Sequence, residues 1–363
     1  MKHKHTHTHT RRGVALGLTA AFALAFLPAT AVASEDDIAS AQATLTAPGG
    51  DDTDAPSTAP ATDDPGDLDA LAGSPVTLRS DATWDLFHVL NTARIANGRE
   101  PLVQHAGMNA VATNWAGTQA ARGTYSLQRT QLEAQLTTTV GVWADGYEGI
   151  FRIAASSTDD AITRLAETYL TSTNPMVTGA ATDIGLAVAQ TPYYGTVSWY
   201  TLYLVSFAKP HTVARSGELT MYRFFRPDTG THFYTTTAAE RNSVAKNPGY
   251  RYEGQVAYVL QPSSTTTGTT ALNRFYTPPT GTHFYTASQT EYARVLTYPQ
   301  YTLDGVAAKV YANQATGTVP MYRFFRPDTG THFYSASTAE VAAVKQMPGY
   351  RYEGVAYFLR IAS

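Results

Sequence analysis

The pattern of apolar and polar positions changes along the chain and predicts different elements in its middle and C-terminal parts. Between residues 80 and 170, apolar side chains recur three and four residues apart. This spacing predicts helices over residues 81–98, over residues 107–121 and from residue 158 onwards, with Ser80 and Gly98 bounding the first. Two runs of β-branched and aromatic residues, at 183–189 and 196–207, predict an antiparallel strand pair after a turn at 191–195. Residues 77–210 are therefore expected to form an α+β domain.

The C-terminal part repeats one pattern three times. The segment MYRFFRPDTGTHFY begins at Met221 and returns at Met321, and a looser copy, LNRFYTPPTGTHFY, begins at Leu272. Each copy predicts a strand, a tight turn, a second strand, a short helix and a final strand. The repeats occupy residues 219–261, 272–312 and 319–361 of a domain that spans 219–363.

A unit of this size cannot bury a core by itself, so the three copies are expected to pack against one another. Closure around an axis also removes exposed sheet edges. We therefore predict a β-rich, pseudo-threefold, β-trefoil-like domain with one short helix per repeat. Three small sheets packed side by side are the alternative.

The first 76 residues predict a leader and a linker. Residues 1–33 contain four basic side chains, an apolar run and then Ala31 and Ala33, which predicts a secretory signal peptide cleaved after Ala33. Residues 34–76 contain ten acidic side chains and no Lys or Arg, which predicts a disordered acidic linker. The protein is expected to be secreted or extracellular, with no stable membrane span after signal cleavage.

Composition excludes several kinds of site. The chain has no cysteine, so neither disulfides nor thiolate metal sites can form. Residues 77–363 contain 22 basic and 19 acidic side chains, a balance that offers no electrostatic basis for binding nucleic acid. The sequence predicts no cofactor.

The segment LNTARIANGREPLVQHAGMNAVATNWAGTQA resembles the opening of bacterial CAP (SCP-like) domains, members of the cysteine-rich secretory/antigen 5/pathogenesis-related superfamily. Asn91 and Arg94 match the family's N-x-x-R, and the strands at 183–189 and 196–207 resemble its closing strands. The resemblance covers most of residues 77–210 and implies an α/β/α sandwich. It also implies a cleft that usually presents two His and two Glu able to hold a divalent metal.

This sequence departs from that cleft. Leu127 and Pro175 stand where the family has histidines, and Glu148 keeps one acidic position. One carboxylate without imidazole partners is a poor metal site and lacks the second group that acid–base catalysis needs. Glu148 is therefore a weak catalytic candidate, and apolar replacements would suit a bound lipid. His88 and His105 are expected to be surface or packing residues.

Nine residues recur at matched positions of the repeats and form the candidate ligand-binding set. Aromatic faces can stack on sugar rings while His and Arg bond hydroxyl groups, and three weak sites would gain by avidity. The alternatives are structural: each Arg could clamp the acid that precedes a later Gly (Glu253, Asp304 or Glu353), and each His could bond the backbone. A metal held by three His is a further alternative. The set is Arg223, Arg274, Arg323, His232, His283, His332, Tyr234, Tyr285 and Tyr334.

The repeats resemble a bacterial domain family of uncharacterised function that occurs at the ends of secreted proteins. That resemblance implies an extracellular module without an established activity. We predict a non-enzymatic binding or adhesion protein that recognises a glycan or another cell-wall ligand through its repeats. The alternatives are a CAP-type hydrolase or protease using Glu148, with the repeats as a targeting module, and a purely structural repeat module.

Overall fold

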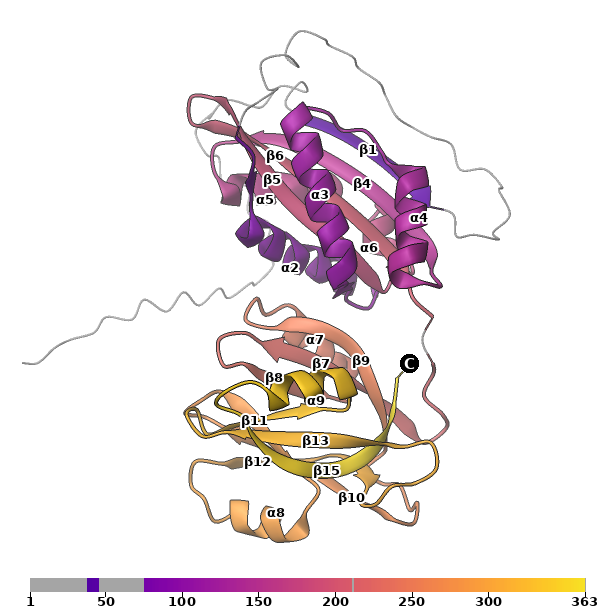
Figure 1. Cartoon of the computed structure of the whole chain (residues 1–363), viewed down its shortest axis with the longest axis vertical. Helices are drawn as coiled ribbons and strands as arrows, with labels where there is room; N and C mark the ends of the chain where they lie inside the picture. Colours follow the sequence, from indigo (N-terminus) through magenta and orange to yellow (C-terminus); the bar gives the residue numbers. More distant parts are fainter. Residues whose placement is uncertain (1–37, 46–74, 211, 363) are drawn as a thin grey trace, which may run out of the picture.

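A computed structural model describes residues 38–45, 75–210 and 212–362 (Figure 1). The predicted signal peptide, and all of the predicted acidic linker except residues 38–45, 75 and 76, lie outside these ranges. The described chain contains helices and two largely antiparallel sheets, which confirms the α+β class. Among the helices of these ranges, none combines the length and the apolar character needed to cross a membrane.

The N-terminal sheet has the strand order β1-β4-β6-β5-β2, with the short strand β3 paired in parallel to β5. Its strands are β1 (Ile38–Leu45), β2 (Thr77–Leu78), β3 (Val103–Gln104), β4 (Ala144–Ala155), β5 (Asp183–Tyr194) and β6 (Val197–Ala208). The helices are α2 (Ser80–Ala96), α3 (Ala106–Arg122), α4 (Arg129–Val140), α5 (Thr158–Tyr169) and α6 (Pro175–Thr178).

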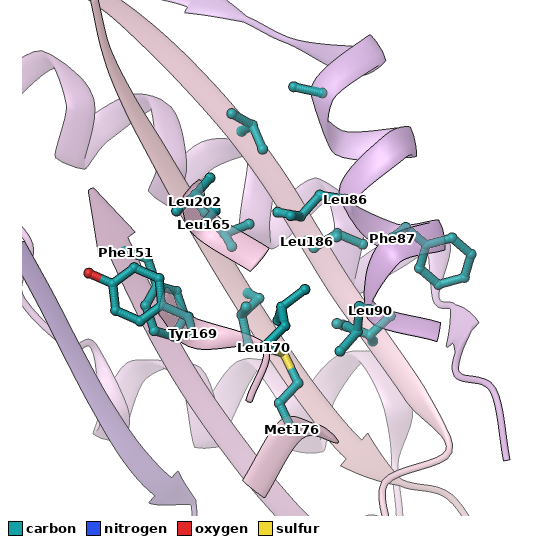
Figure 2. Close-up of a cluster of buried hydrophobic side chains, with 14 of the residues drawn as sticks. Leu86, Phe87, Leu90, Phe151, Leu165, Tyr169, Leu170, Met176, Leu186 and Leu202 are labelled. Carbon is teal, nitrogen blue, oxygen red and sulfur yellow. The ribbon is translucent and has the colours of Figure 1, made fainter. Parts of the chain in front are cut away.

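Helices cover both faces of this sheet because successive strand residues point to opposite sides. Leu186 and Val188 of β5 join a buried cluster with Leu86 of α2 and Leu165 of α5 (Figure 2). Ala187, between them, packs on the other face among the alanines of α3. The sheet therefore lies between two helical layers.

The structure corrects three sequence expectations here. Residues 38–45, expected to be disordered linker, form β1 along the edge of β4, where Leu45 is buried beside Trp143. Helix α4 and strand β4 were not expected, and β4 is buried on both faces, so it lacks an alternating pattern. Strand β5 continues through the expected turn to Tyr194, and Gly195 with a φ of 55° makes a tighter turn.

The repeats form three lobes with the same order of elements, as predicted. Lobe 1 contains β7 (Glu218–Arg226), β8 (Thr231–Thr235), α7 (Ala238–Ala245) and β9 (Arg251–Leu260). Lobe 2 contains β10 (Thr269–Thr277), β11 (Thr282–Thr286), α8 (Gln289–Val295) and β12 (Thr302–Tyr311). Lobe 3 contains β13 (Val319–Arg326), β14 (Thr331–Ser335), α9 (Thr338–Lys345) and β15 (Arg351–Ile361).

Local chemistry explains each lobe. In lobe 1, Gly230 takes a φ of 64° at the β7–β8 turn, a conformation that costs glycine little. Thr237 caps α7 by accepting a hydrogen bond from the Glu240 amide. Ser288 and Ser337 cap α8 and α9 in the same way.

The last strands of the three lobes join the module into one sheet system. Lys309 of β12 pairs with Leu260 of β9, Tyr311 pairs with Phe358 of β15, and β15 pairs in turn with β9. A shared apolar core lies between the lobes and includes Met221, Leu272 and Met321 at matched positions. Each lobe therefore depends on the other two for its buried surface.

Lobe 1 also packs against the N-terminal part of the chain. The Trp84 indole donates a 3.1 Å hydrogen bond to the Pro248 carbonyl, and Arg241 forms an ion pair with Glu100. Val103 joins the apolar cluster that contains Tyr252. Tyr252 is 3% exposed, whereas the matching Tyr352 of lobe 3 is 43% exposed, so this interface covers one lobe more than another.

Candidate functional site

Each lobe holds one repeated arginine beside an acidic residue of its own last strand. Arg223 on β7 lies opposite Gly254 on β9, so the preceding Glu253 is brought alongside. Arg223 Nε is 2.7 Å from Glu253 Oε2. The same contact recurs between Arg274 and Asp304 (3.0 Å) and between Arg323 and Glu353 (2.8 Å). The structure thus supports the predicted arginine–acid clamp within each lobe.

The same arginines also reach a glutamate on the first turn of a neighbouring lobe's helix, which the sequence did not predict. Because each lobe contacts the next, the three contacts close a cycle. We call the contact regions junction 1/2, junction 2/3 and junction 3/1. They contain Arg274–Glu240 (2.8 and 3.0 Å), Arg323–Glu291 (2.8 and 3.0 Å) and Arg223–Glu340 (2.9 Å), respectively.

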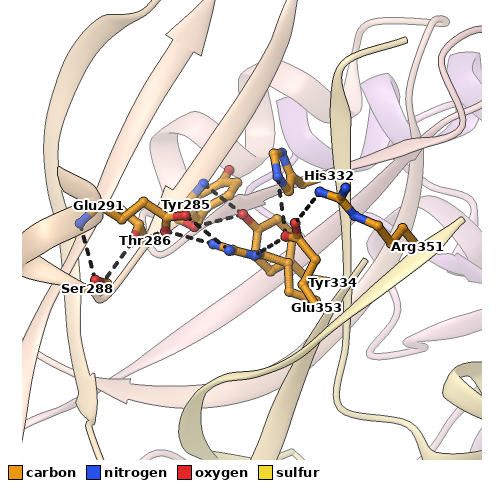
Figure 3. Close-up of polar contacts among 9 residues, drawn as sticks. Tyr285, Thr286, Ser288, Glu291, His332, Tyr334, Arg351 and Glu353 are labelled. Carbon is orange, nitrogen blue, oxygen red and sulfur yellow. Dashed lines mark hydrogen bonds and ion pairs between the residues drawn. The ribbon is translucent and has the colours of Figure 1, made fainter. Parts of the chain in front are cut away.

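The repeated histidines lie inside these networks. His332 Nε2 is 3.5 Å from Glu353 of its own lobe, and its ring packs at a tilt against Phe284 of lobe 2 with centroids 4.8 Å apart. Figure 3 shows His332 and Arg351 both directed towards Glu353, beside Tyr334. His232 and His283 have the same relationships, to Glu253 and Phe333 and to Asp304 and Phe233.

Burial keeps these imidazoles neutral near pH 7. Burial, followed by the charge of Arg274, lowers the pKa of His283 to about 4. Burial and the charge of Arg323 likewise lower the pKa of His332 to about 4, and burial lowers the pKa of His232. Each histidine is therefore a neutral partner of a carboxylate and of aromatic rings.

The repeated tyrosines meet at the centre of the module. Tyr285 donates its hydroxyl hydrogen to the Tyr234 carbonyl at 2.9 Å, and Tyr334 donates to the Tyr285 carbonyl at 2.7 Å. Their exposed fractions are 1% each, and that of Tyr234 is 3%. This placement corrects the prediction that all three tyrosines present rings and hydroxyls to a ligand, because those hydroxyls are committed to the backbone.

A metal site formed by the three repeated histidines finds no support in the structure. Their nearest polar partners are carboxylates of their own lobes, and their rings lie against phenylalanines. Over the residues that the structure describes, no group of three or more His, Cys, Asp or Glu side chains is arranged to hold a metal ion.

Two of the junctions contain pockets. A pocket of about 550 Å³ lies at junction 3/1, bordered by Arg223, Gln255, Ser337 and Thr338 and by an apolar wall that includes Tyr322. Its volume falls in the range of small-molecule sites. A smaller pocket of about 190 Å³ lies at junction 2/3, bordered by Arg323 and its two carboxylate partners, Glu291 and Glu353. The candidate binding site is therefore an inter-lobe feature.

Glu148, the weak catalytic candidate, is fully buried in β4. It accepts a 2.8 Å hydrogen bond from the Gln128 amide and another from the Tyr203 hydroxyl. Burial raises its pKa. Leu127 packs partly buried in a neighbouring apolar cluster, and Pro175 begins α6, so neither position supplies a titratable partner.

The two isolated histidines have local roles. His88 is buried on α2 with its ring 4.6 Å from that of Trp84. His105 caps α3 by accepting a hydrogen bond from the Met108 amide at 3.3 Å. Both placements agree with the expectation of packing or structural roles.

Sequence reasoning missed the residues that shape the junction 3/1 pocket. Glu340 recurs in all three repeats as Glu240 and Glu291, which signals a shared role but not the lobe it contacts. No sequence pattern marks the other pocket residues, Gln255, Ser337 and Tyr322, because they line a pocket only where two particular lobes meet.

Comparison with known proteins bears on the C-terminal module. Residues 220–360 match a protein family described as Domain of unknown function (DUF5648). The match covers all three lobes and agrees with the expected uncharacterised C-terminal domain. No curated protein matches the chain significantly, and neither does any solved structure.

Proposed function

We propose that this protein is a secreted binding or adhesion protein that recognises a glycan through its C-terminal module. In this proposal the three lobes form a pseudo-threefold, β-trefoil-like unit, and the N-terminal part is a degenerate CAP domain. The observation that carries the proposal is the junction 3/1 pocket. It combines hydrogen-bonding side chains, including Arg223 and Gln255, with an apolar wall that includes Tyr322. Saccharides need both, because their hydroxyls form hydrogen bonds and their C–H faces pack on aromatic and apolar surfaces.

The location outside the cell is part of the proposal and is supported by the leader predicted in residues 1–33. Replacing Ala31 and Ala33 by bulky residues should block processing after Ala33. Mass spectrometry of the N-terminus of protein recovered from the medium and from the cells would measure this. A mature protein that still begins with Met1 would overturn the proposed export.

Glycan binding is tested with the chain that remains after cleavage, residues 34–363. A glycan array and a pull-down with insoluble peptidoglycan should each recover specific binding that is competed by free saccharide. Blank results in both assays would overturn the proposed function. Nonspecific adhesion of apolar surface is controlled for by a parallel pull-down. In it, the protein is first unfolded in urea and then diluted into the assay.

A hydrolase that uses Glu148 is the second candidate function. One observation favours it: burial raises the pKa of Glu148, as is common for a general acid, and Tyr203 contacts the carboxyl group. The complete burial of Glu148 opposes it, since a substrate would need an opening to reach the carboxyl group. Hydrolysis of peptidoglycan or casein that is lost on Glu148→Gln would support this candidate.

A further inference from the structure

We infer that junction 3/1 alone of the three lobe junctions binds saccharide, and that its ligand is an uncharged sugar. This inference rests on the proposed function and adds the number of sites and the chemical class of ligand. It replaces three equivalent weak sites with one, because the contacts between side chains close two junctions and leave the third more open.

Junction 1/2 is held closed by side chains from both lobes. Arg274 contacts both carboxylate oxygens of Glu240, a two-point contact that fixes the guanidinium plane. Thr236 Oγ donates a 3.2 Å hydrogen bond to the Ala307 carbonyl across the same junction. A ligand would have to displace both interactions.

Junction 2/3 is occupied by its own charges. Arg323 contacts both oxygens of Glu291, at 2.8 and 3.0 Å. Glu291 and Glu353 border the pocket of about 190 Å³, so its polar groups already satisfy one another. Its volume lies below the range of typical small-molecule sites.

Junction 3/1 lacks both closing devices. Ala336 stands where lobe 1 has Thr236, so this hydroxyl cannot bridge the lobes there, and Ala287 of lobe 2 leaves junction 2/3 without it as well. Arg223 contacts Glu340 through one oxygen, at 2.9 Å, and not through two. A pocket of about 550 Å³ opens beside this arginine. The side of the guanidinium that Glu340 does not occupy can therefore donate to a ligand.

The charges around Arg223 select an uncharged ligand. The guanidinium lies between Glu253 and Glu340, at 2.7 and 2.9 Å, so two carboxylates surround one positive charge. Among the residues that the structure describes, Arg223 is the one charged residue on the pocket's border. Arg251 also contacts Glu253, at 3.4 Å, so the two guanidiniums and the two carboxylates balance. No excess positive charge is left to attract an anionic sugar, whereas a neutral hydroxyl or carbonyl oxygen can still accept a hydrogen bond from Arg223.

The remaining walls match a sugar ring. Gln255 and the hydroxyls of Ser337 and Thr338 can donate and accept hydrogen bonds, as sugar hydroxyls require. The apolar part of the wall comes from Val256, Met321 and Tyr322, which can pack on sugar C–H groups. Polar and apolar groups thus border one concave site.

The first test fills the pocket without disturbing the buried clamps. Thr338 is an exposed residue at the start of α9 and borders the pocket, so Thr338→Trp should block it while leaving the fold intact. Gln289→Trp, at the same helix position in lobe 2, is the matched control because Gln289 is also exposed. With the best neutral glycan from the array as probe, titration calorimetry should show binding lost in Thr338→Trp and unchanged in Gln289→Trp.

The second test removes the proposed donor. Arg223→Gln should weaken binding by about tenfold to a hundredfold, the usual value of a hydrogen bond to a charged group. Arg323→Gln removes the matching clamp of lobe 3 and should leave affinity unchanged, with thermal melts reporting the structural loss in both variants. A third measurement compares a neutral oligosaccharide with its uronic acid counterpart, and the neutral form should bind more tightly.

The outcomes separate the two proposals. If wild-type protein binds a glycan but Thr338→Trp also binds it, or if Arg323→Gln loses as much affinity as Arg223→Gln, the single-site inference is overturned and the glycan-binding function stands. Tighter binding of the uronic acid form would overturn the selection for uncharged sugars. Absence of all saccharide binding by the wild type would overturn the proposed function and this inference together.

Discussion

The hydroxyl of Tyr234 donates a 2.8 Å hydrogen bond to the main-chain oxygen of Tyr334, which joins lobe 1 to lobe 3 at the centre of the module. Tyr334 makes the same bond to Tyr285, and Tyr285 makes it to Tyr234, so the three bonds form a closed ring. Each phenol therefore satisfies a buried carbonyl of another lobe. A buried carbonyl needs such a partner, and here the partner always comes from a different repeat.

This ring predicts that one hydroxyl stabilises the whole module. Tyr285→Phe removes a donor to the Tyr234 carbonyl and an acceptor for the Tyr234 amide, both at 2.9 Å. Two buried main-chain groups would lose their partner, so the free energy of unfolding should fall by about 2–4 kcal/mol. Urea denaturation measures the change. Tyr298→Phe, at a residue that is 40% exposed, is the control and should change it by less than about 0.5 kcal/mol; equal effects would contradict the ring's role.

The elements of each lobe could be predicted from sequence because their signals are local. The turn at Gly230 and the cap at Thr237 depend on residues within a few positions of each other. The same holds for α2 and α5, whose apolar positions recur at helical spacing. Strand β4 could not be predicted in this way, because burial on both faces removes the alternation that marks a strand.

The candidate site could be predicted only in part, because it forms between repeats. Recurrence picks out Arg223 and Glu340 as important positions, but no pattern shows that Arg223 contacts the glutamate of lobe 3. Recurrence also made the tyrosines look available to a ligand, although they are buried. The larger pocket lies where Arg223 contacts Glu340 through one oxygen, whereas the matching arginines of the other two junctions contact both oxygens. The sequences of the repeats do not show this difference.

The buried histidines predict loss of stability as pH falls below neutral. The pKa of His283 and His332 is about 4 in the folded protein, against about 6.5 in an unfolded chain. Between these values the unfolded chain binds more protons, so the free energy of unfolding must decrease as the pH falls from 6.5 to 4. Urea denaturation at pH 7.5, 6.0 and 4.5 measures this slope.

The carboxylates extend the same trend to lower pH. Although burial opposes it, the hydrogen bond from His232 and the charge of Arg223 lower the pKa of Glu253 to about 2. Its contribution is present above its unfolded value of about 4.5 and is lost as pH falls towards 2. Replacing His283 and His332 by Gln, which keeps an amide donor, should reduce the dependence of the unfolding free energy on pH above pH 4.5. The loss of stability below pH 4.5, which comes from the carboxylates, should remain. An unchanged slope above pH 4.5 would contradict the assignment to these histidines.

Two glycines that match between lobes test the packing of lobe 1 on the N-terminal part. A Cβ atom added at Gly254 would lie 2.9 Å from Val103 Cγ2, whereas one added at Gly354 would meet no atom within 4 Å. Both have positive φ, 91° and 99°, so alanine costs similar backbone strain at each. Gly254→Ala should therefore reduce the free energy of unfolding by about 1–3 kcal/mol more than Gly354→Ala.

Calorimetric melting of the full chain measures this difference, and Val103→Ala supplies a second check. Removing the valine methyl groups creates room for the new Cβ, so the double variant Val103→Ala with Gly254→Ala should recover most of the added loss. If Gly254→Ala and Gly354→Ala melt alike, lobe 1 does not pack on Val103 in solution.

The buried carboxyl of Glu148 predicts a pH effect of the opposite sign. Burial raises its pKa above 4.5, so the folded protein holds the proton at pH values where the unfolded chain has lost it. Stability contributed by this residue must then decrease as pH rises, because the native state binds more protons. Glu148→Gln removes the titration but keeps an oxygen that can accept from Gln128 and Tyr203. Relative to wild type, this variant should therefore gain unfolding free energy as the pH rises from 4 to 8.

The control for this prediction is Glu167→Gln, at an exposed residue of α5, which should show no such gain because this side chain is not enclosed by the core. Urea denaturation of wild type and both variants across the same pH range gives the comparison. A flat difference between Glu148→Gln and wild type would mean that Glu148 titrates as an exposed carboxyl does. In that case Glu148 would lack the raised pKa that favours the hydrolase candidate, and that candidate would lose its supporting observation.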